Sequence, residues 1–140
     1  MEFKILSDAN EDIFALRTQA FVVEKNVPKN IEFDGKDNEY MHFCVYDNNS
    51  VVGCARVNQS GDVLHIGRVA VNTSLRGKGY GRKLFEFIEC YAKEKQIKSL
   101  ELDAIETAVG FYKKMGFITV GDFFEEAGWP HINMVKNIEI

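Results

Sequence analysis

The chain has 140 residues, of which 46% are hydrophobic and 27% charged, and only two are proline. A single domain of this size buries enough apolar surface to fold without disulfides, and this composition excludes a disordered chain. The 17 basic and 21 acidic residues give a net charge of −4, which argues against a nucleic-acid binder.

No run of residues is long and apolar enough for a membrane-spanning helix, and the N-terminal residues lack the charged-then-apolar pattern of a signal peptide. Cys44, Cys54 and Cys90 are odd in number and widely spaced, so reduced thiols are the simplest interpretation. We therefore expect a cytoplasmic protein that binds no membrane, no nucleic acid and no metal.

The first half of the chain predicts a strand and a helix, followed by an antiparallel meander. Residues 2–6 form the predicted strand, and Asp8 is placed to cap a helix that extends to about Lys25. Residues 28–40 form a long polar connection, and such irregular loops in compact domains often carry function. Turn residues then separate three predicted strands over residues 41–47, 51–58 and 63–72.

The second half alternates helices with strands. Amphipathic helices are predicted over residues 79–95 and 105–115, on either side of a strand over residues 98–103. Two final strands are predicted over residues 117–124 and 132–138. The pattern predicts a single α/β domain over residues 1–140, with a mixed, mostly antiparallel central sheet flanked by helices.

The most informative segment is residues 67–82, where a strand leads into glycines that alternate with basic residues and then into a helix. Glycines allow the main chain to approach a ligand closely, and free N–H groups at the helix start form an anion site. Arg76, Lys78 and Arg82 add positive charge at the same place. The chemistry indicated is pyrophosphate binding, although a glycine-rich helix start without a ligand also fits.

Two well-known phosphate-binding turns match this segment poorly. A Walker A loop requires Ser or Thr after Gly-Lys, but here Gly79 follows Lys78. A dinucleotide fingerprint requires a third Gly or Ala where this chain has Arg82 or Leu84. In that fingerprint the glycines follow the strand directly, whereas residues 72–75 separate them from the strand here.

A third comparison fits better. Residues 76–81, with the sequence Arg-Gly-Lys-Gly-Tyr-Gly, resemble the Arg/Gln-x-x-Gly-x-Gly/Ala motif of the GNAT superfamily of acyl-CoA-dependent N-acetyltransferases. Residues 108–117 are similar to the A-x-x-F-Y-x-x-x-G-F segment of the same superfamily. Residues 21–28, 67–71 and 126–131 resemble segments of its small bacterial ElaA-like branch, although Lys25, Ile105 and Trp129 depart from that pattern.

The resemblance implies a GNAT-like fold and transfer of an acetyl group from acetyl-CoA, a co-substrate, to an amine. The residues implied or expected to contact acetyl-CoA are Val69, Ala70, Val71, Arg76, Gly77, Lys78, Gly79, Tyr80, Gly81, Arg82 and Phe111. The resemblance assigns protonation of the departing thiolate to Tyr112. Because Tyr112 also lies on the apolar stripe of its predicted helix, core packing alone would explain it equally.

A protonated amine has a pKa near ~10.4 and must lose a proton before it attacks, so a general base is needed. The candidates are His65 on the strand before the glycines, Glu32 in the polar loop, and Glu126 and His131 beside the Gly128–Pro130 turn. Solvated surface positions explain Glu32 and His65 equally well. We expect Glu32, Glu126 and His131 to converge on the acetyl end of the cofactor.

Two functions therefore stay open. The first is an N-acetyltransferase whose acceptor is a small-molecule amine or a peptide. The second is a non-catalytic acyl-CoA-binding or sensing domain, which would need the glycine-rich turn but no base. A homodimer is also left open.

Overall fold

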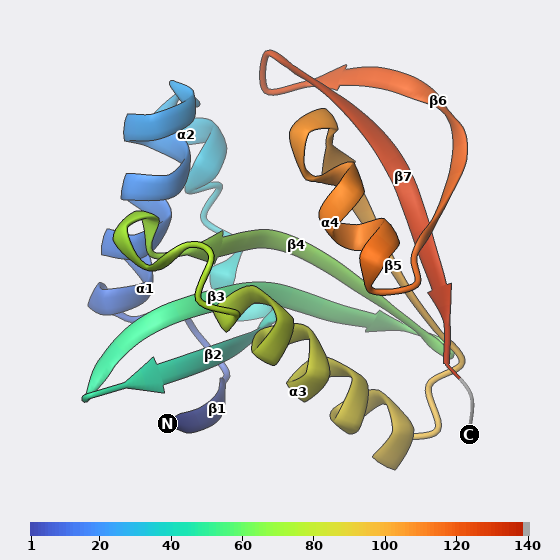
Figure 1. Ribbon diagram of the computed structural model, residues 1–140. Helices are drawn as coiled ribbons and strands as arrows, with labels where there is room; N and C mark the ends of the chain where they lie inside the picture. Colours follow the sequence, from blue (N-terminus) through green and yellow to red (C-terminus); the bar gives the residue numbers. More distant parts are fainter. Residues whose placement is uncertain (139–140) are drawn as a thin grey trace.

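Seven strands form one mixed sheet in the order β1-β2-β3-β4-β5-β7-β6 in the computed structural model, which describes residues 1–138 (Figure 1). The strands are β1 (Glu2–Leu6), β2 (Met41–Asp47), β3 (Ser50–Ser60), β4 (Val63–Val71), β5 (Ser99–Ile105), β6 (Ile118–Glu126) and β7 (Trp129–Asn137). Neighbouring strands are antiparallel except for β4 and β5, which are parallel. The predicted α/β class and mostly antiparallel mixed sheet are confirmed.

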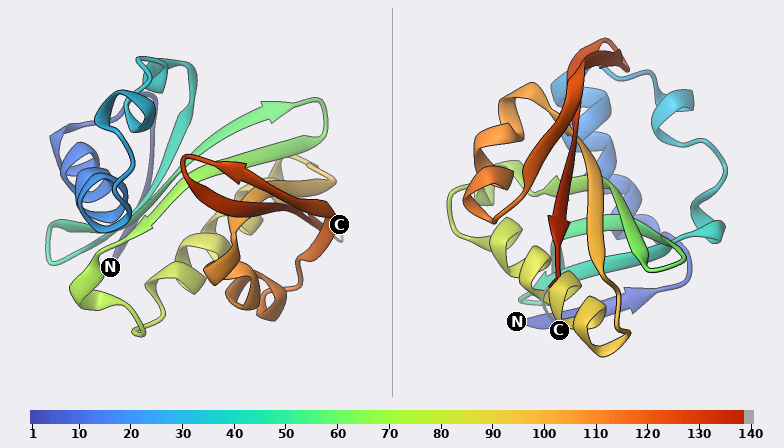
Figure 2. Two further views of the ribbon diagram at one scale, coloured as in Figure 1. Left: turned by 90° about the horizontal axis from the view of Figure 1, so that it is seen from above. Right: turned by 90° about the vertical axis from the view of Figure 1, so that its right-hand side faces the viewer.

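Helices cover both faces of this sheet (Figure 2). The α-helices are α1 (Glu11–Arg17), α2 (Lys29–Glu32), α3 (Tyr80–Glu94) and α4 (Val109–Lys114). The π-helix η1 (Thr18–Val23) continues α1, and the 3₁₀ helices are η2 (Asp37–Glu39), η3 (Thr73–Leu75) and η4 (Glu106–Ala108). None of the helices within residues 1–138 is long and apolar enough to span a membrane.

The two sheet faces bury separate hydrophobic clusters. Leu84 and Ile88 of α3 are fully buried against one face together with Phe43 of β2. Ile13 and Leu16 of α1 are buried against the other face. Alternate side chains of the central strands are therefore buried on both faces, as a sheet covered on both sides requires.

One prediction about the N-terminal helix was wrong. Asn10 rather than Asp8 caps α1, because the Asn10 side chain accepts a hydrogen bond of 3.0 Å from the Ile13 N–H. Asp8 instead accepts one from its neighbour Ala9. The helical segment itself extends to Lys25 as predicted, although it widens from α1 into the π-helix η1 after Arg17.

The parallel pairing of β4 with β5 is short, and the two strands separate where it ends. It runs only from the Val63–Ser99 pair to the Ile66–Leu102 pair. Directly after it, β4 contains a bulge opposite β3, because Cys54 pairs with Ala70 whereas Arg56 pairs with Gly67. Beyond Ile66, the edge of β4 that faces β5 therefore pairs with none of the strands within residues 1–138.

Candidate active site

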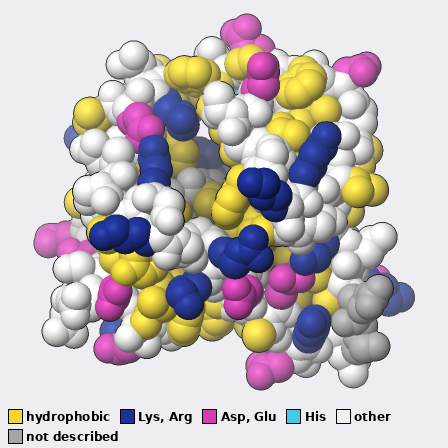
Figure 3. All heavy atoms as spheres, viewed as in Figure 1, with side chains coloured by type: hydrophobic (Ala, Val, Ile, Leu, Met, Phe, Trp, Pro, Cys, Tyr) yellow, Lys and Arg dark blue, Asp and Glu magenta, His cyan; other side chains and the backbone are white. Residues whose placement is uncertain are grey.

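A cavity of about 320 Å³ lies where β4 and β5 separate. Glu32, Tyr112, Glu126 and His131 all line it, together with Val69 of β4. Figure 3 shows a hollow between the two halves of the molecule, with Lys and Arg side chains gathered around it. The 28–40 segment and the β6–β7 turn therefore line one cavity, and their convergence on the acetyl end of a cofactor stays a prediction.

The ring of Tyr112 packs among other aromatic rings at the cavity. Its ring lies edge-on to the rings of Phe85, Phe111 and Phe117, at centroid distances of 5.4, 5.3 and 5.7 Å. Tyr112 is only 6% exposed, and no fully buried side-chain oxygen or nitrogen within residues 1–138 lacks a hydrogen-bond partner. No hydrogen bond joins the Tyr112 hydroxyl to another group of residues 1–138, and Tyr112 lines the cavity.

Burial also decides the protonation of this hydroxyl. Loss of solvation raises the pKa of Tyr112 well above its usual value, because the phenolate is disfavoured in an apolar environment. The group is therefore a proton-bearing donor at neutral pH. Its arrangement fits a hydrogen bond to a ligand atom in the cavity.

His131 has a defined tautomer and lies beside a carboxylate. Its Nδ1 is 2.8 Å from the main-chain oxygen of Trp129, and because a carbonyl only accepts, Nδ1 carries the hydrogen. In the neutral ring, Nε2 therefore has a free lone pair, and it lies 3.8 Å from Oε2 of Glu126. A base and a negative charge thus sit side by side on the wall of the cavity.

Glu32 lines the same cavity, but its carboxylate is paired with the guanidinium groups of Arg17 and Arg68. Arg17 Nε donates to Glu32 Oε2 at 2.7 Å, and Arg68 Nε lies 3.3 Å from Oε1. Burial raises the pKa of Glu32, while the hydrogen bond from Arg17 acts in the opposite direction. This geometry favours a structural carboxylate over a general base.

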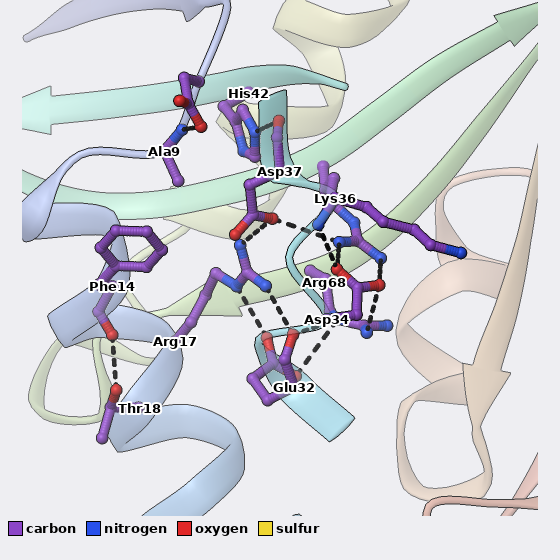
Figure 4. A network of polar contacts seen from close by, with 12 residues as sticks. Ala9, Phe14, Arg17, Thr18, Glu32, Asp34, Lys36, Asp37, His42 and Arg68 are labelled. Atoms are coloured by element: carbon purple, nitrogen blue, oxygen red, sulfur yellow. Dashed lines mark hydrogen bonds and ion pairs between the residues drawn. The ribbon is translucent and has the colours of Figure 1, made fainter. Parts of the chain in front are cut away.

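Six charged side chains form what we term the ion-pair network (Figure 4). Its members are Arg17, Glu32, Asp34, Asp37, Arg56 and Arg68. The network holds the 28–40 segment against the sheet, and that segment contains α2 and η2 rather than the predicted irregular loop.

His65 lies outside the cavity walls. It is on β4 before the bulge, and its Nδ1 is 3.9 Å from Oε2 of Glu101 on β5. The side chain is 43% exposed. The geometry therefore supports the reading of His65 as a residue of the sheet surface.

The glycine-rich turn has the conformation that a close ligand approach needs. Gly77 and Gly79 have φ angles of 83° and 84°, in the region that disfavours other residues. Gly79 precedes α3, so the N–H groups of the first turn have no partner within the helix. Lys78 and Arg82 are exposed there and form no ion pair with the described acids.

Two side chains of the turn are engaged elsewhere. Arg76 forms a two-pronged ion pair with Glu24 at the end of η1, with Nη2 2.8 Å from Oε2. The Tyr80 hydroxyl donates to Asp47 at the end of β2. The Tyr80 hydroxyl therefore points away from the turn, and only the main-chain N–H of Tyr80 is placed to bind an anion at the start of α3.

The remaining residues expected at acetyl-CoA border the gap between the strands. Val69, Ala70 and Val71 form the end of β4, whose β5-facing edge is unpaired, and the Ala70 side chain is buried under α1. Phe111 is 40% exposed on α4 and lies close to Gly81. Within residues 1–138, no group of three His, Cys, Asp or Glu side chains is arranged to hold a metal ion.

Several cavity residues were not predicted as site residues. Arg68, Asp103 and Trp129 all line the cavity. Arg68 and Trp129 lie within segments that resemble the ElaA-like branch, so the motif contained a signal for them. Asp103 lies at the cavity because β5 separates from β4 directly before it. This position depends on the strand pairing, which the sequence alone does not show.

Comparison with known proteins agrees with this geometry. Residues 6–138 match the family model described as Acetyltransferase (GNAT) domain. The uncharacterized N-acetyltransferase YjcF of Bacillus subtilis is 34% identical over 128 residues, covering 91% of this chain and 91% of that protein. Protein ElaA of Escherichia coli is 34% identical over 131 residues, covering 90% of this chain and 86% of that protein.

Solved structures extend the comparison. The crystal structure of Escherichia coli ElaA has a TM-score of 0.82 and 32% identity, covering 96% of this chain and 98% of that chain. An aminoglycoside 6'-N-acetyltransferase complexed with coenzyme A shares the fold, with a TM-score of 0.77 and 16% identity, covering 100% of this chain and 98% of that chain. The resemblance to the ElaA-like branch is confirmed, and this chain belongs to the GNAT family of acetyltransferases.

Proposed function

We propose that this protein transfers the acetyl group of acetyl-CoA to a primary amine bound in the cavity between β4 and β5. One observation carries the proposal: a tyrosine, a histidine whose Nε2 has a free lone pair, and the edge of β4 that has left β5 line one cavity. Each supplies one part of what acyl transfer to an amine needs: a proton donor, a proton acceptor and a docking edge.

The donor side fits a long chain that ends in a pyrophosphate. Main-chain groups on the open edge of β4 at Val69 and Val71 are suited to pair with the amide groups of a pantetheine arm. The N–H groups at the start of α3, with Lys78 and Arg82, are suited to the pyrophosphate. A related fold holds coenzyme A in the aminoglycoside 6'-N-acetyltransferase structure, which supports this assignment.

His131 is the proposed proton acceptor. Its Nδ1–H is fixed on the Trp129 carbonyl, so Nε2 takes the proton of the incoming ammonium, and Glu126 Oε2 at 3.8 Å stabilises the resulting imidazolium. The neutral amine then forms the new C–N bond at the acetyl carbonyl carbon supplied by acetyl-CoA, and the charged nitrogen so formed loses its second proton to solvent. His131 finally releases its proton to solvent.

Tyr112 is the proposed proton donor to the leaving sulfur. Its hydroxyl remains protonated because burial raises its pKa, and it donates to the sulfur as the C–S bond breaks. Solvent returns the proton to Tyr112. The products are an N-acetylated amine, the free thiol and one released proton, so atoms and charges balance.

A non-catalytic acyl-CoA-binding domain is the competing function. Such a domain would use the glycine-rich turn but would not need Tyr112 and His131 at the same cavity. Their common location favours the enzyme.

A thermal-shift comparison tests the donor side directly. Acetyl-CoA and CoA should each raise the melting temperature of the protein, whereas NAD should not, because a ligand that binds only the folded state stabilises it. Stabilisation by NAD without any by CoA would overturn the proposal. Stabilisation by acetyl-CoA without turnover of any amine would favour the non-catalytic domain.

A further inference from the structure

The ion-pair network attaches the acceptor-side wall of the cavity to three elements of the scaffold (Figure 4). Its three carboxylates belong to the 28–40 segment, and its three guanidinium groups come from α1, β3 and β4. Three negative charges thus face three positive charges. Each arginine makes contacts of a different kind, which allows their roles to be separated.

Arg17 and Arg56 are buried anchors of the fold. Arg17 is 1% exposed and donates to Glu32 Oε2, to the Glu32 carbonyl and to Asp37 Oδ1 at 2.7 to 2.9 Å. Arg56 is 7% exposed and donates hydrogen bonds to both carboxylate oxygens of Asp34, at 2.9 and 3.1 Å. Removing either would break ion pairs to two of the three carboxylates and leave a cavity among buried charges, which strongly destabilises a folded protein.

Arg68 is different, because its side chain is more exposed than those of Arg17 and Arg56 and its contacts with the carboxylates are longer. Without Arg68, each of its two carboxylates would keep the shorter of its ion pairs. Glu32 would keep Arg17, and Asp34 would keep Arg56. The Arg68 side chain is 27% exposed, and its main contacts are with the end of α2. Nη2 donates to the Ile31 carbonyl at 3.2 Å, and Nε lies 3.4 Å from the Glu32 carbonyl and 3.3 Å from Glu32 Oε1.

The backbone of Arg68 is also unusual. It lies in the β4 bulge with a φ angle of 50°, a left-handed conformation that costs a non-glycine residue free energy. The bulge places Arg68 where β4 leaves β5, and the side chain crosses from there to α2. Both Arg68 and the residues that it contacts, Ile31 and Glu32, line the cavity.

We propose that Arg68 is a positioning residue that fixes α2, the acceptor-side wall, relative to the β4 edge that holds the acyl donor. The proposal rests on the proposed function, since it assigns the two sides of one cavity to two substrates. Through its contacts with two carbonyl groups and one carboxylate, Arg68 sets the width of the cavity at the point where the substrates meet.

Arg68→Gly removes the guanidinium and also relieves the left-handed backbone. We expect the KM for the amine to rise about tenfold or more, because charge-assisted hydrogen bonds that order the wall are lost. The Kd of acetyl-CoA should change less than about twofold, and the melting temperature should not fall. Arg68→Lys retains the charge but cannot bridge three oxygens, so its KM should lie between those of the wild type and Arg68→Gly.

Hydrogen exchange gives a readout that does not depend on turnover. The amides of residues 31–33 in the α2 turn should exchange faster in Arg68→Gly than in the wild type, with or without an amine present. Arg82→Ala, at the glycine-rich turn, is the matched arginine control and should weaken acetyl-CoA binding while leaving this exchange unchanged.

Unchanged exchange at residues 31–33 in Arg68→Gly would overturn the proposal. A loss of acetyl-CoA affinity as large as the loss for the amine would overturn it too, because Arg68 would then act on both sides of the cavity. If the wild type acetylated no amine, the proposed function would fail, but the exchange measurement would still decide whether Arg68 holds α2.

Discussion

Gly81 and Phe111 lie in contact although they belong to different helices. A Cβ atom added to Gly81 would lie 3.0 Å from Cζ of Phe111 and 3.7 Å from Cγ2 of Val71. The start of α3 thus packs against α4 at the end of β4, where three segments expected to contact acetyl-CoA meet. A side chain at position 81 would push directly on that junction.

Gly81→Ala should therefore weaken acetyl-CoA binding more than it affects the fold. Phe111 is 40% exposed and can yield by the few tenths of an ångström needed, while alanine favours the helix by up to about 1 kcal/mol over glycine. We expect the Kd of acetyl-CoA, measured by calorimetry, to rise severalfold with little change in melting temperature. Gly110→Ala, where an added Cβ meets nothing within 4 Å, is the matched control. Equal affinities in the two variants would contradict this account.

Tyr112→Phe tests the proton donor. The ring contacts with its aromatic neighbours would remain and only the hydroxyl would be lost, so kcat should fall about ten- to a thousandfold while the Kd of acetyl-CoA stays nearly constant. Tyr91→Phe is the matched control, because the Tyr91 hydroxyl contacts Met41 Sδ at 3.5 Å outside the cavity. Unchanged turnover in Tyr112→Phe would return this residue to a packing role.

His131→Gln and His65→Gln separate the two histidine candidates for the base. His131 lines the cavity beside Glu126, whereas His65 faces Glu101 outside its walls. We expect kcat/KM for the amine to fall about a hundredfold in His131→Gln and to stay unchanged in His65→Gln. Steady-state kinetics at several pH values measures kcat/KM for both variants. A loss of kcat/KM in His65→Gln alone would identify His65, on the sheet surface, as the base instead.

Asp34 makes the stability of the protein depend on pH. The hydrogen bond from Arg56 lowers the pKa of Asp34 to about 2, below its value of about 3.9 in an unfolded chain. Its stabilising contribution is therefore complete above about pH 4 and is lost as the pH falls toward 2. The difference in unfolding free energy between wild type and Asp34→Asn should shrink over this range in urea titrations.

Asp62→Asn provides the comparison for that experiment. Asp62 and Lys98 form an exposed ion pair at 3.7 Å, which contributes little at any pH. Burial raises the pKa of Glu32, so its effect on the pH dependence of stability has the opposite sign to that of Asp34. Because Glu32 is present in all three proteins, this effect largely cancels in the differences in unfolding free energy. A gap between wild type and Asp34→Asn that stayed constant from pH 4 to pH 2 would contradict the assigned pKa.

The sequence predicted best those elements whose pattern is local. The apolar spacing of Leu84 and Ile88 indicated α3 within a residue at each end, since one buried face at helical period is sufficient evidence. The convergence of Glu126 and His131 on the cavity was also predicted, because both flank one turn that resembles a known branch. Asn10 was missed as the cap, since Asp8 is an equally good capping residue and the helix start differs by only two positions.

The ion-pair network had no comparable signal in the sequence. Arg17 and Glu32 lie 15 positions apart, and Arg68 lies 36 positions from Glu32, so only the folded sheet brings them together. Glu32 was accordingly considered as a base, whereas its carboxylate is held by two arginines. The bulge that turns Arg68 toward α2 likewise depends on strand register, which residue type alone does not encode.

Mass spectrometry of the reaction products shows directly whether this protein acetylates an amine. The wild-type protein would be incubated with acetyl-CoA labelled in the acetyl group and a panel of amines, polyamines, amino sugars and peptides. We expect at least one amine to gain the labelled acetyl group, in a one-to-one ratio with released thiol, and Tyr112→Phe to slow this transfer. Saturable binding of acetyl-CoA with no labelled amine across the panel would contradict it.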